Sequence, residues 1–323
     1  MYDPDRIFNI TDEEQFRREA LALFAFQAER CEPYRRYLQL LGIDPGQVDS
    51  IDRIPYLPIG IFKTHEVYCG DREPQLVFTS STTGGMTPSR HPMADLSIYE
   101  RDFRACFRRF YGDASQWSIY GLLPSYLERT GSSLIYMVDR LIADTGGHGG
   151  FYLDDYPRLL DDMAREPRKK ILIGVSYALL DMAERYAPKL HDTTVMETGG
   201  MKGRRREMSK PELHSTLCEA FGVDRIHSEY GMAELTSQAY SSGEGIFFTP
   251  PWMRISIRDL NDPFTHLATG QRGGIDIIDL GNIYSCAFIQ TEDAGRLLPN
   301  GGFEVNGRID RSEIRGCNLL VQN

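Results

Sequence analysis

Long apolar runs and paired cysteines are absent from this chain of 323 residues. No run approaches the ~20 apolar residues that a bilayer crossing needs. The first residues also lack the basic and then apolar order of a secretory signal. The six cysteines form no C-x-x-C pair, so neither a disulfide framework nor a zinc site is indicated. We therefore expect a cytoplasmic protein with free thiols and no membrane span.

Positive charge is in short supply, with 36 Lys and Arg against 46 Asp and Glu, a net charge of -10. This balance argues against broad contact with nucleic acid or an anionic membrane, but leaves room for one small anionic ligand. Lysine is rarer still, because the last one is Lys210 and the final 113 residues contain none. Hydrophobic residues at 41% and charged residues at 25% are typical of a globular protein.

Periodicity predicts one integrated domain in three parts. Residues 1–105 hold N-terminal helices, an extended segment at 54–63 and a hydroxyl-rich loop. Residues 106–240 alternate strands with helices, the pattern of a parallel α/β layer. Residues 241–323 lose the helical period and indicate a β-rich subdomain.

The expected elements follow from the same patterns. Thr11 and Glu14 suggest a capping box that opens a helix over 11–30, and a second helix covers 34–41. Further helices are expected at 98–110, 132–143, 156–165, 177–186 and 210–221. Strands are expected at 117–123, 170–174, 194–198, 225–227, 246–249, 254–259, 274–280 and 285–290.

A loop rich in hydroxyl groups follows a short apolar run at 76–78. Its backbone N–H and hydroxyl groups can converge on a phosphate chain, and glycine lets the backbone approach the anion. Neither the Walker pattern nor the dinucleotide glycine fingerprint is present. The candidate phosphate ligands are Thr79, Ser80, Ser81, Thr82, Thr83, Gly84, Gly85 and Thr87.

Two further clusters carry acidic and basic side chains suited to a nucleotide. Glu234 follows the turn Tyr230-Gly231 and offers an oxygen ligand for Mg²⁺. Asp293 in Thr291-Glu292-Asp293 can accept hydrogen bonds from ribose hydroxyls. Arg308 in Gly307-Arg308 can contact ribose or phosphate.

The order and spacing of these segments resemble the core motifs of the adenylate-forming acyl-activating superfamily. Within it, the chain is most similar to the acyl-protein synthetase (LuxE-type) branch over residues 50–320. The segments that carry this closer resemblance are Ile54–Lys63, Glu197–Gly203 and Ser312–Leu320. The resemblance implies the large α/β domain of that superfamily, and the chain ends where other relatives continue into a mobile C-terminal domain.

The resemblance implies that a carboxylic acid, fatty or another small organic acid, reacts with ATP to give an acyl-adenylate, with Mg²⁺ as cofactor. The hydroxyl-rich loop would hold the phosphates and Glu234 the metal. Gly199, Gly200 and Tyr230 would lie against the adenine, Asp293 would bind ribose, and Arg308 would contact the nucleotide. Because the lysine of the C-terminal domain is missing, the resemblance leaves Lys202 or Arg204 as the catalytic cation.

The acyl acceptor implied by the resemblance is a thiol. Cys317 matches the acylated cysteine of the branch, and nearby arginines could lower its pKa. Coenzyme A, a carrier protein or a partner acyl reductase are the other acceptors.

Two other functions stay open. The run Gly174-Val-Ser176-Tyr-Ala178 approaches the nucleophile elbow of α/β-hydrolases, with Ser176 as nucleophile. A degenerate relative that binds nucleotide as a scaffold is the third interpretation.

Overall fold

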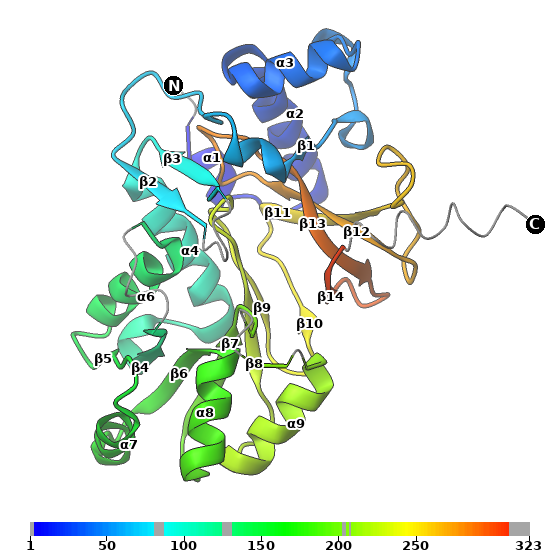
Figure 1. Ribbon diagram of the computed structural model, residues 1–323. Coiled ribbons are helices and arrows are strands. Elements are labelled where there is room, and N and C mark those ends of the chain that lie inside the picture. Colours follow the sequence, from blue (N-terminus) through cyan, green and yellow to red (C-terminus); the bar gives the residue numbers. More distant parts are fainter. Residues whose placement is uncertain (1–2, 81–86, 125–130, 202–204, 207, 310–323) are drawn as a thin grey trace, which may run out of the picture. The chain divides into compact units, whose positions relative to one another are not determined.

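The computed structural model describes residues 3–80, 87–124, 131–201, 205–206 and 208–309. The chain forms two compact units, each built around a sheet (Figure 1). Unit 1 contains residues 1–75, 91–94 and 248–323, and unit 2 contains residues 76–90 and 95–247. The expected fold class, parallel α/β layers together with a β-rich part, is confirmed.

Unit 1 begins with helices α1 (Asp5–Phe8), α2 (Glu13–Arg30) and α3 (Glu32–Leu40). The cap of α2 lies one residue later than the Thr11 and Glu14 box predicts. The Asp12 side chain accepts from the Gln15 backbone N–H, and the Gln15 side chain accepts from the Thr11 N–H, each at 2.8 Å. Asp12 therefore caps the first turn of α2, and Gln15 satisfies the N–H of Thr11, the residue before the cap.

The segment after α3 contains short 3₁₀ helices, η1 (Pro45–Gln47) and η2 (Ile51–Arg53), before the apolar run at 54–63. The prediction that this run is extended is wrong for its second half. Strand β1 (Leu57–Pro58) is extended, but η3 (Ile59–Lys63) is a 3₁₀ helix. Pro58 has φ of -57° and ψ of 128°, so the chain is still extended there, and η3 begins at the next residue.

The sheet of unit 1 is antiparallel, in the order β14-β13-β12-β11, with β1 added parallel to β13. Strand β13 begins three residues later than the predicted start at 285 and runs far beyond the predicted end. Thr291 and Asp293 therefore lie inside a strand. The bounds are β11 (Met253–Arg258), β12 (Arg272–Asp279), β13 (Phe288–Leu297) and β14 (Phe303–Arg308).

Unit 2 is built on a sheet in the order β5-β4-β6-β7-β8-β9, parallel except for the last pair. The bounds of its strands are β4 (Trp117–Leu122), β5 (Gly149–Phe151), β6 (Lys169–Val175), β7 (Thr193–Thr198), β8 (His227–Tyr230) and β9 (Ala239–Ser241). The helices are α4 (Leu96–Tyr111), η4 (Ala114–Gln116), α6 (Ser133–Asp144), α7 (Tyr156–Arg165), α8 (Ser176–Tyr186) and α9 (Lys210–Phe221). Three short strands complete the chain: β2 (Leu76–Thr79), β3 (Arg90–Met93) and β10 (Ile246–Phe247).

The predicted helices and strands of unit 2 are confirmed to within two residues at each end, except the strand at 225–227. That strand is β8, and it begins at His227. Its residues His, Ser, Glu and Tyr are polar but mostly buried, so hydrophobicity does not mark it. Helices α8 and α9 lie side by side (Figure 1).

Within the described part of the chain, no helix has the length and apolar character that crossing a bilayer requires. The expectation of free thiols is confirmed for Cys31, Cys69, Cys106, Cys218 and Cys286.

Candidate active site

The stem of the hydroxyl-rich loop is fixed by hydrogen bonds. The Ser80 N–H donates to the Ser89 carbonyl at 3.1 Å, and the Ser89 N–H donates to Ser80 Oγ at 2.9 Å. The Thr79 N–H donates to the Gly131 carbonyl at 2.8 Å. Of the candidate phosphate ligands, the structure describes Thr79, Ser80 and Thr87. The others lie outside the described residues: Ser81, Thr82, Thr83, Gly84 and Gly85.

The predicted adenine turn, Gly199-Gly200, follows directly after β7. Gly199 has φ of +67°, a left-handed conformation that glycine adopts without strain. Both glycines are exposed, and a Cβ placed on Gly200 would meet no described atom within 4 Å. The turn lies at the carboxyl edge of a parallel sheet, where open α/β folds bind their ligands.

Glu234 lies in the loop that joins β8 to β9. Tyr230 and Ala239 pair directly across these antiparallel strands, so the two ends of the loop are held together. Residues 233–238 are buried although they form no helix or strand, and Glu234 is only 5% exposed. A Cβ on Gly231 would lie 2.4 Å from Glu229 Oε1, so a larger residue would require the buried Glu229 carboxylate to move.

The two predicted nucleotide segments leave neighbouring strands at the same edge of the sheet. Thr198 pairs in register with Glu229, one residue before Gly199 and Tyr230 respectively. The Thr198 hydroxyl also donates to Glu229 Oε2 at 2.5 Å. Unit 2 therefore places Gly199, Gly200, Tyr230 and Gly231 at one edge of its sheet, and their contact with adenine stays a prediction.

Glu229 itself was missed by the sequence analysis. Burial raises its pKa, the Thr198 hydroxyl lowers it, and the negative charge of Glu197 raises it further, to about 7. The only sequence signal is its place immediately before the Tyr-Gly turn.

A second missed residue, Glu197 in β7, lies at the centre of a buried polar network that we call the Glu197 network: Glu197, Lys210, His214, Ser176 and Ser228. The carboxylate is 1% exposed and forms an ion pair with Lys210 Nζ. His214 Nε2 lies 3.5 Å from Glu197 Oε1 and 3.4 Å from Ser228 Oγ. Burial alone raises the pKa of Glu197, but the Lys210 charge and the hydrogen bonds lower it to about 2. The sequence signal for it was a carboxylate next to Val195 and Met196 in a predicted strand.

In unit 1, Asp293 and Arg308 are brought together. They pair in register across β13 and β14, with Arg308 Nε 3.9 Å from Asp293 Oδ1. The Thr291 hydroxyl accepts from the Asp293 N–H at 3.1 Å and donates to the Ile275 carbonyl at 2.7 Å. The Thr-x-Asp segment is therefore rigidly held, while the Arg308 side chain is 79% exposed and can turn toward a ligand.

Lys202 and Cys317 lie outside the described residues, as does Arg204.

The donors around Glu234 fit Mg²⁺. Mg²⁺ is bound through one or two carboxylates together with substrate phosphates and waters, and Glu234 supplies one buried carboxylate. Residues 3–309, apart from the gaps given above, contain no group of three or more His, Cys, Asp or Glu that could hold a metal by itself.

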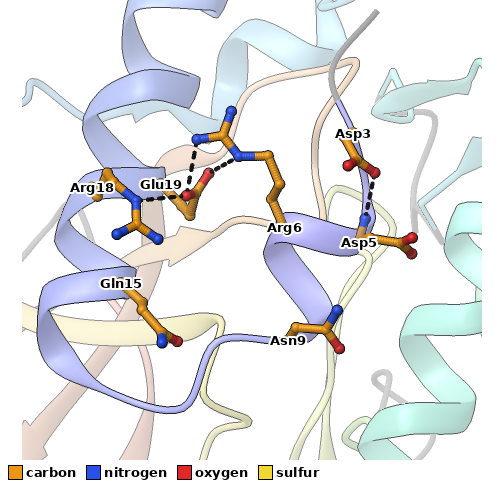
Figure 2. Close-up of a pocket in the computed structure, with 7 residues that line it drawn as sticks. All are labelled: Asp3, Asp5, Arg6, Asn9, Gln15, Arg18 and Glu19. Carbon is orange, nitrogen blue, oxygen red and sulfur yellow. Dashed lines mark hydrogen bonds and ion pairs between the residues drawn. The ribbon is translucent and has the colours of Figure 1, made fainter.

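Two pockets in unit 1 contain none of the predicted site residues. The larger, of about 350 Å³, lies between α1 and α2, where Arg6 and Arg18 both point at the buried carboxylate of Glu19 (Figure 2). Arg6 Nε lies 3.0 Å from Glu19 Oε2, and Arg18 Nε lies 3.1 Å from Oε1. This cluster joins the two helices. The second pocket, of about 220 Å³, is lined by Tyr37, Tyr56, Phe264 and His266 among others.

Comparison with known families supports the resemblance. The family profile for acyl-protein synthetase, LuxE, matches residues 3–110. The match includes the Ile54–Lys63 segment and the hydroxyl-rich loop. The resemblance to acyl-protein synthetases is confirmed there. No curated protein matches the sequence.

Solved structures with a similar fold include MatB and a 2-hydroxyisobutyryl-CoA ligase. ATP-bound MatB from Rhodopseudomonas palustris is 16% identical, with a TM-score of 0.57 over 74% of this chain and 50% of its own. 2-Hydroxyisobutyryl-CoA ligase in the postadenylation state is 15% identical, with a TM-score of 0.70 over 95% of this chain and 70% of its own. The chain spans about half the length of the MatB structures that it matches. At these identities the likeness shows the adenylate-forming fold.

Proposed function

We propose that the protein uses ATP to activate a carboxylic acid as an acyl-adenylate and then transfers the acyl group to a thiol. The observation that supports this most directly is the pairing of Thr198 with Glu229. This pairing brings the glycine turn and the Tyr-Gly turn to one edge of a parallel sheet. The match to acyl-protein synthetases and the fold of acyl-CoA ligases agree with this reading.

In the first half-reaction a carboxylate oxygen of the acid attacks the α-phosphorus of ATP. The bond from that phosphorus to the bridging oxygen breaks, and pyrophosphate leaves with the electron pair. The residues of this chain position the nucleotide: the hydroxyl-rich loop holds phosphate oxygens, Gly199-Gly200 lies against adenine, and Asp293 binds ribose. Glu234 would hold Mg²⁺, which would supply charge neutralisation at the phosphates.

In the second half-reaction a thiolate attacks the acyl carbonyl carbon, and AMP leaves with the electron pair of the carbon–oxygen bond. Cys317 is the acceptor that we propose first, ahead of coenzyme A, a carrier protein or a partner reductase.

Hydrolysis through Ser176 is not supported by the geometry. Its hydroxyl is buried and directed at a carboxylate, at 3.2 Å from Glu197 Oε2. The His214 imidazole, which could have served as a general base, contacts Glu197 and Ser228.

The first experiment is ATP–pyrophosphate exchange over a panel of short, aromatic and long-chain acids. We expect exchange that depends on one class of acid and on Mg²⁺. Binding of ATP without exchange for any acid would contradict adenylation and favour a nucleotide-binding scaffold.

The acceptor is tested with Cys317→Ser. A residue that acts only in the second half-reaction leaves the first intact. The variant should keep exchange and lose covalent, hydroxylamine-labile labelling by a radioactive acid with ATP. Retained labelling would exclude Cys317 and favour coenzyme A or a partner as acceptor.

A further inference from the structure

The Gly199-Gly200 turn is exposed, and its backbone accepts a hydrogen bond from a buried side chain. A Cβ on Gly200 would meet no described atom within 4 Å. A hydrogen bond to the backbone of such a turn can fix its position.

One side chain that reaches this backbone is Ser176, the first residue of α8. Its Oγ lies 3.2 Å from the Gly199 carbonyl oxygen and 3.2 Å from Glu197 Oε2. A hydroxyl carries one proton, so Ser176 donates to either acceptor and stays between them. Ser176 is 2% exposed, so water does not compete for these contacts.

The carboxylate beside Ser176 is itself fixed from a different helix. Lys210 and His214 lie four residues apart, on one face of α9, and both contact Glu197. A buried carboxylate keeps its charge only when cations and donors surround it. The Glu197 network therefore offers Ser176 a fixed, charged acceptor next to the turn.

We propose that Ser176 is a positioning residue for ATP, which holds the Gly199-Gly200 turn ready for the adenine ring while the rest of the Glu197 network holds Ser176. The proposal rests on the proposed function. It assigns Ser176 a structural contact with the nucleotide turn and no contact with the reacting atoms.

The test compares Ser176→Ala with Ser241→Ala. Ser241 is a matched control, since its buried hydroxyl also donates to a glycine carbonyl, that of Gly243 at 2.8 Å, but far along the chain from the turn. Two quantities test the proposal: amide hydrogen exchange of the peptide covering 196–201, and the affinity for ATP by calorimetry. The turnover of ATP–pyrophosphate exchange at saturating ATP is measured as well, to report on folding.

We expect Ser176→Ala to speed amide exchange in the turn and to weaken ATP binding roughly 5- to 10-fold, the loss of one hydrogen bond. The turnover of ATP–pyrophosphate exchange at saturating ATP should stay unchanged, whereas a general loss of folding would lower it. Ser241→Ala should change neither quantity. Glu197→Gln, which keeps the shape of the side chain, should give a smaller change in the same direction.

The proposal would be overturned if Ser176→Ala and Ser241→Ala had equal amide hydrogen exchange in the turn, or equal affinity for ATP. A wild-type protein that binds no ATP would overturn the proposed function, a different failure that is seen without any variant.

Discussion

Each unit contains a buried carboxylate paired with a cation inside or beside its sheet, Asp276 in unit 1 and Glu197 in unit 2, and the two pairs serve different parts of the fold. In unit 1, Arg258 Nη1 donates to Asp276 Oδ1 at 2.6 Å, and the guanidinium also reaches the Ile275 and Thr291 carbonyls. The pair therefore ties β11, β12 and β13 together in the middle of a sheet. In unit 2, the Glu197 network lies at a strand end and gathers side chains from α8 and α9.

The pKa values of the two carboxyl groups follow this difference. Burial outweighs the Arg258 charge and raises the pKa of Asp276 to about 7. At Glu197, burial is outweighed by Lys210 and several hydrogen bonds, and the pKa falls to about 2. The Arg258–Asp276 pair joins three strands but leaves the pKa of its carboxyl group raised. The Glu197 network surrounds its carboxylate with more donors, and these keep it ionised next to the Gly199-Gly200 turn.

The largest expected effect comes from removing the cation of the strand-end network. Lys210→Met leaves Glu197 buried without its ion pair, which costs roughly 3–5 kcal/mol of unfolding free energy. Urea unfolding at pH 7 measures it. Adding Glu197→Gln to Lys210→Met should recover most of the loss, because the uncompensated charge is then gone.

Lys189→Met is the matched control, since Lys189 is exposed and donates to the Glu219 carbonyl. A loss for Lys210→Met as small as that of Lys189→Met would mean that the Glu197 network does not hold a charge.

We expect the residues assigned to the metal and to ribose to affect different kinetic quantities, the maximal exchange rate for Glu234 and the KM for ATP for Asp293. Glu234 in unit 2 is assigned to the metal that neutralises charge in the transition state, so Glu234→Ala should lower the maximal exchange rate about 10²-fold. Exchange at saturating ATP and acid measures this loss. Glu219→Ala removes an exposed carboxylate and serves as control. Wild-type exchange with unchanged Mg²⁺ dependence in Glu234→Ala would remove Glu234 from the site.

Asp293 in unit 1 is assigned to ground-state binding of ribose. Asp293→Ala should raise the KM for ATP roughly 10-fold with little change in kcat, the pattern of lost uniform binding. Glu292→Ala is a close control, because Glu292 Oε2 also lies 3.9 Å from Arg308 but is not assigned to ribose. Equal effects of the two substitutions would show that Arg308, and not Asp293, carries the contact.

The sequence predicted the periodic elements and the glycine turns well, because helices such as α7 and α9 show a clear amphipathic or capping pattern. It misplaced β8, whose buried residues are polar, and it ended the strand at 290, although Thr291–Asp293 lie in β13. Glu197, Glu229 and Lys210 were missed as functional residues, since only the fold brings these distant positions together.

The smallest expected effect tests Glu229, the carboxyl group that links the two nucleotide turns. Its folded pKa of about 7 lies above the ordinary 4.5, so the folded state prefers the protonated form. Its contribution to stability is complete below pH 4.5 and is lost as the pH rises through 7.

Glu229→Gln resembles the protonated form at every pH. At pH 8 the variant should be more stable than the wild type by about 1 kcal/mol, because relief of the buried charge exceeds the weakened bond from Thr198. At pH 5 the gain should vanish or change sign. Urea unfolding of both proteins at the two pH values measures this difference, in which other titrating groups such as Asp276 cancel. An equal stability change at pH 5 and pH 8 would mean that Glu229 is ionised throughout, and that the link between the turns is a charged hydrogen bond like that of Glu197.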